Sequence, residues 1–121
     1  MSIEKISSAL NKFTQQNPFI VAAAIIGPDG LPIASTISSS SEESKLCGGT
    51  STILSTAKRV LMDLNLGSLK RCCFVSENGI LYISHLTDRS LLLVVARKET
   101  RLGALLYEVA SLTDTLMQNI R

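Results

Sequence analysis

The chain has 121 residues, of which 45% are hydrophobic, 18% charged and 4% aromatic, and its formal net charge is +2. This length is typical of one domain, and so small a charge with so few rings does not indicate a nucleic-acid-binding surface. The longest apolar run, Phe19 to Ile26, has 8 residues, whereas a membrane-spanning helix needs about 20. We therefore expect a single domain over residues 1–121, without membrane insertion, whose excess of apolar residues serves self-association.

The N-terminal segment and the cysteines both indicate a reducing compartment. MSIEKISSALNKF has no continuous apolar stretch and no small-residue cleavage site, so it does not resemble a secretory signal. The cysteines are Cys47 and the adjacent pair Cys72 and Cys73, an odd number without the spacing of a disulfide framework or a zinc site. We expect reduced thiols that pack as small core residues in a cytoplasmic protein.

The first third of the chain predicts a helix followed by a hairpin. An apolar side chain recurs at every third or fourth position of the first segment, at Ile3, Ile6, Leu10 and Phe13, which is typical of an amphipathic helix that ends before Pro18. FIVAAAIIG is apolar throughout and predicts a strand covered on both faces. GPDG then turns the chain into LPIASTI, where Pro32 cannot donate a ladder hydrogen bond and so marks an edge strand or the first residues of a strand.

The middle of the chain predicts a long second helix. Ser40 and Glu43 have capping-box spacing, and we expect the helix to end near Gly67. Its apolar stripe consists of Leu46, Thr50, Ile53, Leu54, Ala57, Val60, Leu61 and Leu64. This spacing predicts a second amphipathic helix.

The remaining segments predict three strands and a last helix. KRCCFVSE and ILYISHL flank Asn78-Gly79, a strong hairpin signal in which both turn residues take positive φ. SLLLVVARK is apolar on both faces and should be central in the sheet. Apolar residues from Leu102 to Ile120 then share one helical face, with Thr100 as the expected cap.

Residues that could do chemistry are few and scattered. His85, the single histidine, lies near Asp88 and Ser90, but all three fall within one strand end and one turn, whereas a triad converges from separate elements. Asp29 lies in GPDG, whose Gly-x-x-Gly spacing could suggest a phosphate-binding loop. Such a loop leads into a helix, whereas extended chain follows here. We therefore expect Asp29 to form the turn. We therefore predict no enzyme, no cofactor and no metal site.

The second helix and third strand instead predict a contact surface. Gly48 and Gly49 each weaken a helix by about 1 kcal/mol relative to alanine, and no charged residue lies between Lys45 and Lys58. A small, uncharged face lets another backbone approach closely, although a frayed, solvated helix start would show the same composition. If KRCCFV lies at the edge of the sheet, pairing across a two-fold axis would extend the sheet and bring two copies of the helix together.

The order α-β-β-α-β-β-β-α resembles the roadblock / dynein light chain domain family over nearly the whole chain. The resemblance rests on AAIIGPDGLPIAS for the first hairpin, STAKRVLMDLNLGSLKRCCFVSENGILYISHL for the middle and LLLVVARKETRLGALLYEVASL for the end. It implies an α+β fold with a five-stranded antiparallel sheet, one helix on one face and two on the other. It also implies a non-enzymatic dimer, formed through the second helix and third strand into a ten-stranded sheet, that binds a small Ras-like GTPase. The compact length resembles the stand-alone prokaryotic members.

Two hypotheses follow for the function. The first is a homodimeric adaptor that regulates the nucleotide state or localisation of a small Ras-like GTPase, with a GTPase-binding surface at Lys58, Arg59 and Arg71, where a basic rim would steer an acidic partner. The expected dimer contacts are Gly48, Gly49, Thr52, Ser55, Thr56, Cys73 and Val75. The alternative is a small-molecule sensor of profilin-like αβ fold, which the scarcity of convergent polar residues at the inward positions disfavours.

Overall fold

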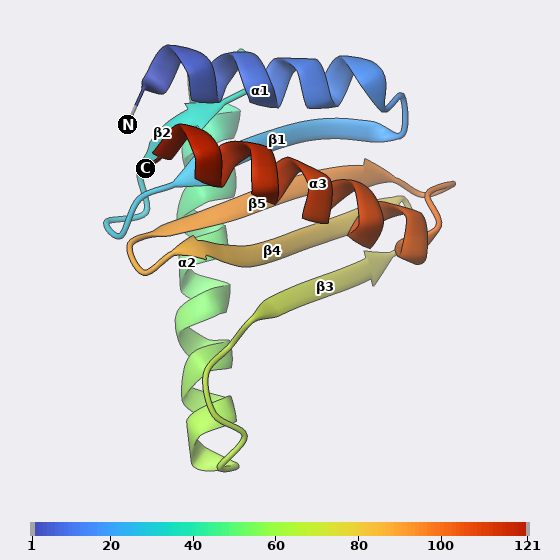
Figure 1. Ribbon diagram of the computed structural model, residues 1–121. Coiled ribbons are helices and arrows are strands. Elements are labelled where there is room, and N and C mark those ends of the chain that lie inside the picture. Colours follow the sequence, from blue (N-terminus) through green and yellow to red (C-terminus); the bar gives the residue numbers. More distant parts are fainter. Residues whose placement is uncertain (1, 121) are drawn as a thin grey trace.

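The computed structural model describes residues 2–120 (Figure 1). Its elements are α1 (Ile3–Gln16), β1 (Ile20–Ile26), β2 (Pro32–Ser35), α2 (Ser40–Asp63), β3 (Arg71–Ser76), β4 (Gly79–Thr87), β5 (Ser90–Arg97) and α3 (Leu102–Ile120). The strands form one antiparallel sheet in the order β2-β1-β5-β4-β3. The predicted order of elements is confirmed, and β2 and β3 are the two edges.

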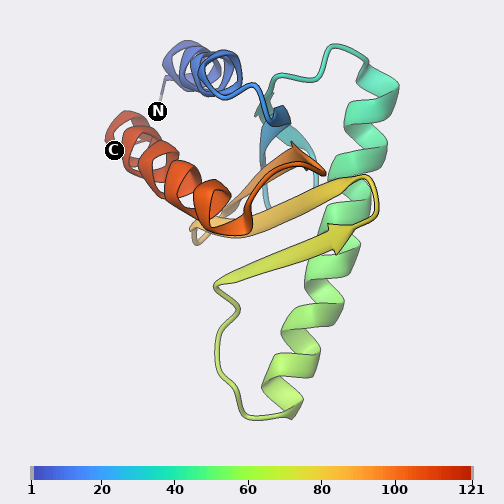
Figure 2. The same ribbon diagram turned by 90° about the vertical axis from the view of Figure 1, so that its right-hand side faces the viewer.

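The helices cover both faces of the sheet (Figure 2). Helices α1 and α3 lie on one face, where Leu10 and Leu105 join a core cluster with Leu92 of β5. Helix α2 lies on the other face, where Leu54 packs with Leu93. Neighbouring residues of β5 thus enter opposite layers, because successive side chains of a strand point to opposite faces. The predicted layers, with one helix on one face and two on the other, are confirmed.

The turn between β1 and β2 is built by Asp29 and Gly30. The Leu31 N–H donates to Asp29 Oδ1 at 3.1 Å, and the Gly27 N–H donates to the Leu31 carbonyl at 2.8 Å. Gly30 has φ of 81°, a conformation that costs glycine little. The expected hairpin is confirmed, and the Asp29 carboxylate serves the turn.

Both predicted helix N-caps are wrong. Ser39, not Ser40, caps α2: its hydroxyl accepts a hydrogen bond from the Glu42 N–H at 3.3 Å. The Glu43 carboxylate turns away from the helix start and accepts a hydrogen bond from the Ser35 hydroxyl. At α3 the first turn closes from the Leu105 N–H to the Arg101 carbonyl, so the helix starts one residue later than a Thr100 cap requires. A run of serines precedes α2, and spacing alone did not select between Ser39 and Ser40.

Helix α2 ends at Asp63, and the left-handed residue that terminates it is Asn65 rather than Gly67. Asn65 has φ of 58°, its N–H donates to the Met62 carbonyl at 3.0 Å, and the Leu66 N–H donates to the Leu61 carbonyl at 2.8 Å. These two bonds form a Schellman motif, in which a left-handed residue follows the helix. The prediction that Gly67 ends the helix is therefore wrong, because asparagine also tolerates this conformation.

The predicted turn at Asn78-Gly79 is displaced by one residue. Ser76 pairs with Gly79, so Glu77 and Asn78 form the two-residue loop. Among the described residues positive φ occurs at Asn65, Gly30 and Gly67, so the expectation of positive φ at Asn78 and Gly79 is wrong. Gly79 has a different requirement, because a Cβ there would lie 2.6 Å from the Ala96 carbonyl oxygen.

We expect Gly79→Ala to lower the free energy of unfolding by about 1–3 kcal/mol, because the added methyl forces β4 and β5 apart. Gly103→Ala is the matched control: a Cβ at Gly103 meets nothing within 4 Å, so stability should stay constant or rise by up to about 1 kcal/mol. Urea denaturation measures both. Equal stability of the two variants would contradict the tight contact at Gly79.

Candidate interaction surface

Helix α2 is longer than the sheet that it crosses. Its 24 residues span about 36 Å, whereas the centres of the outer two of 5 strands are about 19 Å apart. Figures 1 and 2 show the helix starting near β2, crossing the strands and continuing beyond the β3 edge. The last turns of α2 therefore extend beyond the sheet, and no residue of the helix after Leu54 is buried.

The overhang of α2 and the edge strand β3 expose large apolar side chains. Met62 is 71% exposed, Leu64 62% and Val75 70%. We call this area the α2–β3 surface; its large apolar members are Ile53, Val60, Met62, Leu64, Leu66, Phe74 and Val75. The predicted apolar stripe of the helix is buried only in part: the buried residues of α2 are Cys47, Thr50 and Leu54.

The predicted dimer residues of α2 lie on exposed parts of the helix. Gly48, Gly49, Thr52, Ser55 and Thr56 are all exposed, and a Cβ at either glycine would meet nothing within 4 Å. The Thr52 and Thr56 hydroxyls each donate to the backbone carbonyl four residues earlier, at 3.2 Å. Their hydrogen bonds are thus satisfied inside the helix, which leaves a face of low polarity.

Helical spacing divides these residues into two rows. Gly49, Ile53, Thr56, Val60 and Leu64 follow one another at intervals of three or four, so they share one flank of α2. Gly48, Thr52, Ser55 and Arg59 form a second row by the same spacing, and it faces outward. Ile53, Val60 and Leu64 were not among the predicted contact residues. The signal that could have found them is the length of the helix compared with the width of five strands.

The two predicted β3 residues differ in environment. Cys73 is half-buried and packs against the α1–α3 layer, whereas Val75 is exposed at the end of the strand. Both carry side chains on the same face of β3, because they are two residues apart. Their assignment to a dimer contact stays a prediction.

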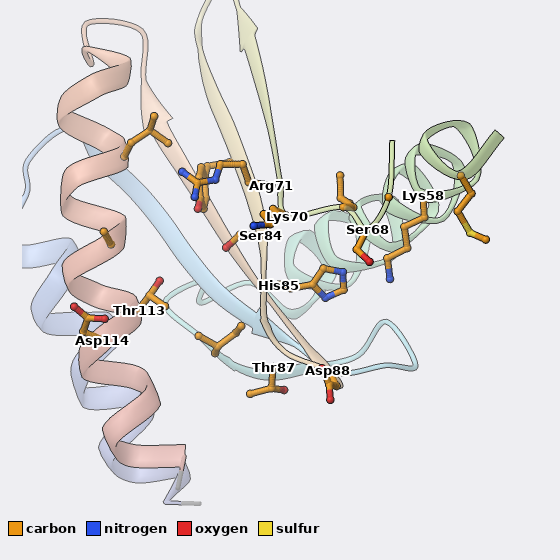
Figure 3. Close-up of a pocket in the computed structure, with 17 residues that line it drawn as sticks. Lys58, Ser68, Lys70, Arg71, Ser84, His85, Thr87, Asp88, Thr113 and Asp114 are labelled. Atoms are coloured by element: carbon orange, nitrogen blue, oxygen red, sulfur yellow. The ribbon is translucent and has the colours of Figure 1, made fainter. Parts of the chain in front are cut away.

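Two of the three predicted GTPase-binding residues line the same hollow (Figure 3). Lys58 from α2 and Arg71 from β3 border a cavity of about 1000 Å³, which is lined by α2, the start of β3, strand β4 and α3. Arg59 is exposed and lies on the outward row of α2, away from this lining. The other polar lining residues are Ser68, Lys70, Ser84, His85, Thr87, Asp88, Thr113 and Asp114.

The hollow continues toward the β1–β2 turn. A second cavity of about 170 Å³, next to Gly27 and Pro28, shares Lys58, His85 and Asp88 with the first. In Figure 3, Lys58, Ser68 and His85 gather on the α2 side, and Thr113 and Asp114 lie across from them on α3. The site thus combines positive charge at the start of β3 with serine and threonine hydroxyl groups from three segments: the loop before β3, strand β4 and helix α3.

The structure does not assemble a catalytic triad around His85. The Ser90 hydroxyl is 2.7 Å from the Thr87 hydroxyl and hydrogen-bonds with it across the β4–β5 turn. Within residues 2–120, no group of three His, Cys, Asp or Glu side chains is placed to hold a metal ion. In the same part of the chain, no helix combines the length and the apolar character that crossing a membrane requires.

The three cysteines are free thiols whose pKa is raised. Burial raises the pKa of the Cys47 thiol, and the nearby Glu43 carboxylate raises it further. Burial also raises the pKa of Cys73, against the opposite influence of Arg71. The thiols therefore stay protonated in the folded protein at neutral pH.

Comparison with known proteins places the chain beside one family. The Roadblock/LC7 domain matches residues 8–96. A Roadblock/LC7 domain from Streptomyces avermitilis shares 17% identity and a TM-score of 0.85, over 94% of this chain and 96% of that one. MglB from Myxococcus xanthus shares 15% identity and a TM-score of 0.87, over 98% and 90%. A structure of MglB with tetrameric arrangement shares 14% identity and a TM-score of 0.83, over 96% and 88%. No curated protein matches the chain.

We expect the Cys47 thiol to make stability depend on alkaline pH. The pKa of this thiol is higher in the folded state than in the unfolded state. Its contribution to the free energy of unfolding is therefore complete below about pH 8.5 and declines as the pH rises further. Between about pH 8 and pH 10, Cys47→Ala should lose less stability than the unsubstituted protein, by at most about 1.4 kcal/mol per pH unit. Urea denaturation across this pH range measures the free energy of unfolding of both proteins. If it falls equally with pH in both, the contribution of Cys47 is contradicted.

Proposed function

This chain belongs to the Roadblock/LC7 domain family, and from that premise we propose that it is a non-catalytic homodimeric adaptor in the cytoplasm. It binds a small Ras-like GTPase and modulates the nucleotide state or localisation of that GTPase. The observation that carries the proposal is the overhang of α2 beside an unpaired strand edge. Family membership supports the class of partner.

The α2–β3 surface supports self-association. A second sheet joined at β3 would place strands beneath the overhang and extend the sheet to ten strands. The exposed side chains of Met62, Leu64 and Phe74 would then leave water, which stabilises a complex by about 25 cal/mol per Å² of apolar surface. The tetrameric arrangement of a structurally similar MglB is consistent with assembly through copies of this fold.

The basic residues support the choice of a GTPase as the partner. Lys58 and Arg71 border the hollow at the end of the sheet, and Arg59 adds a charge on the outward row of α2. Their positive charge would attract an acidic surface. Regulation would follow from stabilising one conformation of the switch regions of the GTPase, because a ligand shifts a conformational equilibrium by its differential affinity.

The hollow favours a second candidate function, a small-molecule sensor. Its volume of about 1000 Å³ falls in the range of ligand pockets, and Lys58, Lys70 and Arg71 would suit an anionic metabolite. The hollow differs from the inward positions considered in the sequence, which are apolar. The two functions predict different stabilising partners. A GTPase should raise the melting temperature of this protein if it is an adaptor, and an anionic metabolite should do so if it is a sensor.

We expect Gly49→Arg to give a folded monomer. An unpaired charge inside the helix contact costs at least about 3 kcal/mol, which weakens dimerisation roughly 100-fold or more. Sedimentation equilibrium measures the dissociation constant, and circular dichroism confirms the fold. Tyr107→Arg is the control, because Tyr107 is exposed on α3, on the opposite side of the sheet. An unchanged dimer in Gly49→Arg would contradict the helix contact.

We expect Lys58→Glu to weaken binding of the GTPase about tenfold by replacing attraction with repulsion. Calorimetric titration with GDP-loaded and GTP-loaded candidates, starting with any Ras-like GTPase encoded beside this chain, measures the effect. Lys12→Glu on α1 makes the same charge change on the opposite face and should have no effect. Binding that is equally strong in both variants would contradict a role for Lys58. Stabilisation by anionic metabolites, without GTPase binding, would favour the sensor.

A further inference from the structure

The backbone groups of β3 alternate between the sheet and the open edge. The His85 N–H donates to the Lys70 carbonyl at 3.4 Å, and Ser76 pairs with Gly79 across a two-residue loop. Both observations give the even-numbered residues of β3 the hydrogen-bonded positions toward β4, since such positions alternate along an antiparallel pair. The odd-numbered residues Arg71, Cys73 and Val75 therefore direct their N–H and C=O groups to the open edge.

This alternation restricts how two copies of β3 can pair. Around a two-fold axis, residue i of one strand faces residue j of the other, and the sum of their numbers is constant. Hydrogen bonds form only if both facing residues are odd-numbered, so the sum is even. The axis then passes through a residue, and pairings with the axis between two residues are excluded.

We propose that two copies of this chain pair along β3 about an axis through Cys73. The inference rests on the proposed self-association and adds its register. With this axis, Arg71 faces Val75 of the second copy and Cys73 faces its own counterpart, so every outward residue of the strand is paired. An axis through Phe74 would place Arg71 opposite Glu77, which lies outside β3, and would leave fewer hydrogen bonds within the strands.

The side chains fit the same register. Phe74, which is 43% exposed, lies opposite Cys72 of the second copy, on the face that α2 covers. Lys70 lies opposite Ser76, so no like charges face each other. Glu77 of the second copy lies one diagonal step from Arg71 on the same face, about 7–8 Å away, which long side chains can span.

The register has a chemical consequence at the axis. Facing residues of a hydrogen-bonded antiparallel pair have Cα atoms about 5.5 Å apart, inside the range of disulfides. Two Cys73 thiols can then form one S–S bond when diamide accepts their two electrons and two protons and becomes the hydrazine. Cys72 points to the other face of the strand and faces Phe74, so it does not meet its counterpart.

Two single substitutions test the register in the full chain. Cys72→Ser retains Cys73, and Cys73→Ser retains Cys72; both retain the buried Cys47. After treatment with diamide, Cys72→Ser should run mostly as a covalent dimer on a non-reducing gel, with Cys73 linked to Cys73 in the peptide map. Cys73→Ser should stay mostly uncrosslinked. The same result in both variants would overturn the assignment of the axis.

A third variant and one further measurement distinguish a wrong axis from an absence of self-association. Efficient crosslinking at position 74 in Cys72→Ser/Cys73→Ser/Phe74→Cys, together with no Cys73 crosslink in Cys72→Ser, would place the axis at residue 74 and overturn the proposal. Sedimentation of each reduced variant reports association itself. A dimer that forms no Cys73 crosslink would overturn the register alone, whereas a monomeric unsubstituted protein would overturn both the register and the proposed self-association.

Discussion

The length of α2 relative to its supporting sheet is the constraint from which the other features of the surface follow. A helix gains most of its stability in a protein from packing an apolar face, and an unpacked helical segment is marginal in water. The part of α2 up to Leu54 packs on the sheet through Cys47, Thr50 and Leu54. The part after Leu54 also carries large apolar side chains, among them Val60 and Met62, which are exposed. Its Schellman motif at Asn65 nevertheless ends the helix well beyond β3, so the overhang is built into the helix.

The exposed overhang of α2 and the exposed edge of β3 lie on the same side of the molecule. Free backbone groups of β3 need hydrogen-bond partners, and apolar side chains of the overhang need cover, and one neighbouring copy could supply both. The low-polarity face of α2 fits this arrangement, because the Thr52 and Thr56 hydroxyls already donate hydrogen bonds within the helix. The hollow with Lys58 and Arg71 lies at the start of β3, so a partner bound there would also touch the junction between copies.

The sequence was sufficient for the order of elements and for the central position of β5, because apolar residues at consecutive positions of β5 require cover on both faces. Pro32 fits both an edge strand and the first residue of a strand, and in β2 it is both. For β3, the edge position was only a condition of the predicted dimer contact. The overhang could not be found in this way, because periodicity shows which residues share a face but not whether another element lies against it. The predicted position of the turn at Gly79 was wrong for a related reason. Glycine is required there by the Ala96 carbonyl of a neighbouring strand, and a dipeptide pattern contains no information about that strand.

Pro32 has a consequence at the opposite edge of the sheet. A strand that pairs with its own copy uses up one edge per molecule and leaves the other edge free, and two free edges could in principle recruit further chains into a fibre. The remaining edge here is β2, which has 4 residues and starts with a residue that has no N–H group. Such an edge is a poor template for another strand, so pairing through β3 would give a closed assembly of two chains rather than an open polymer.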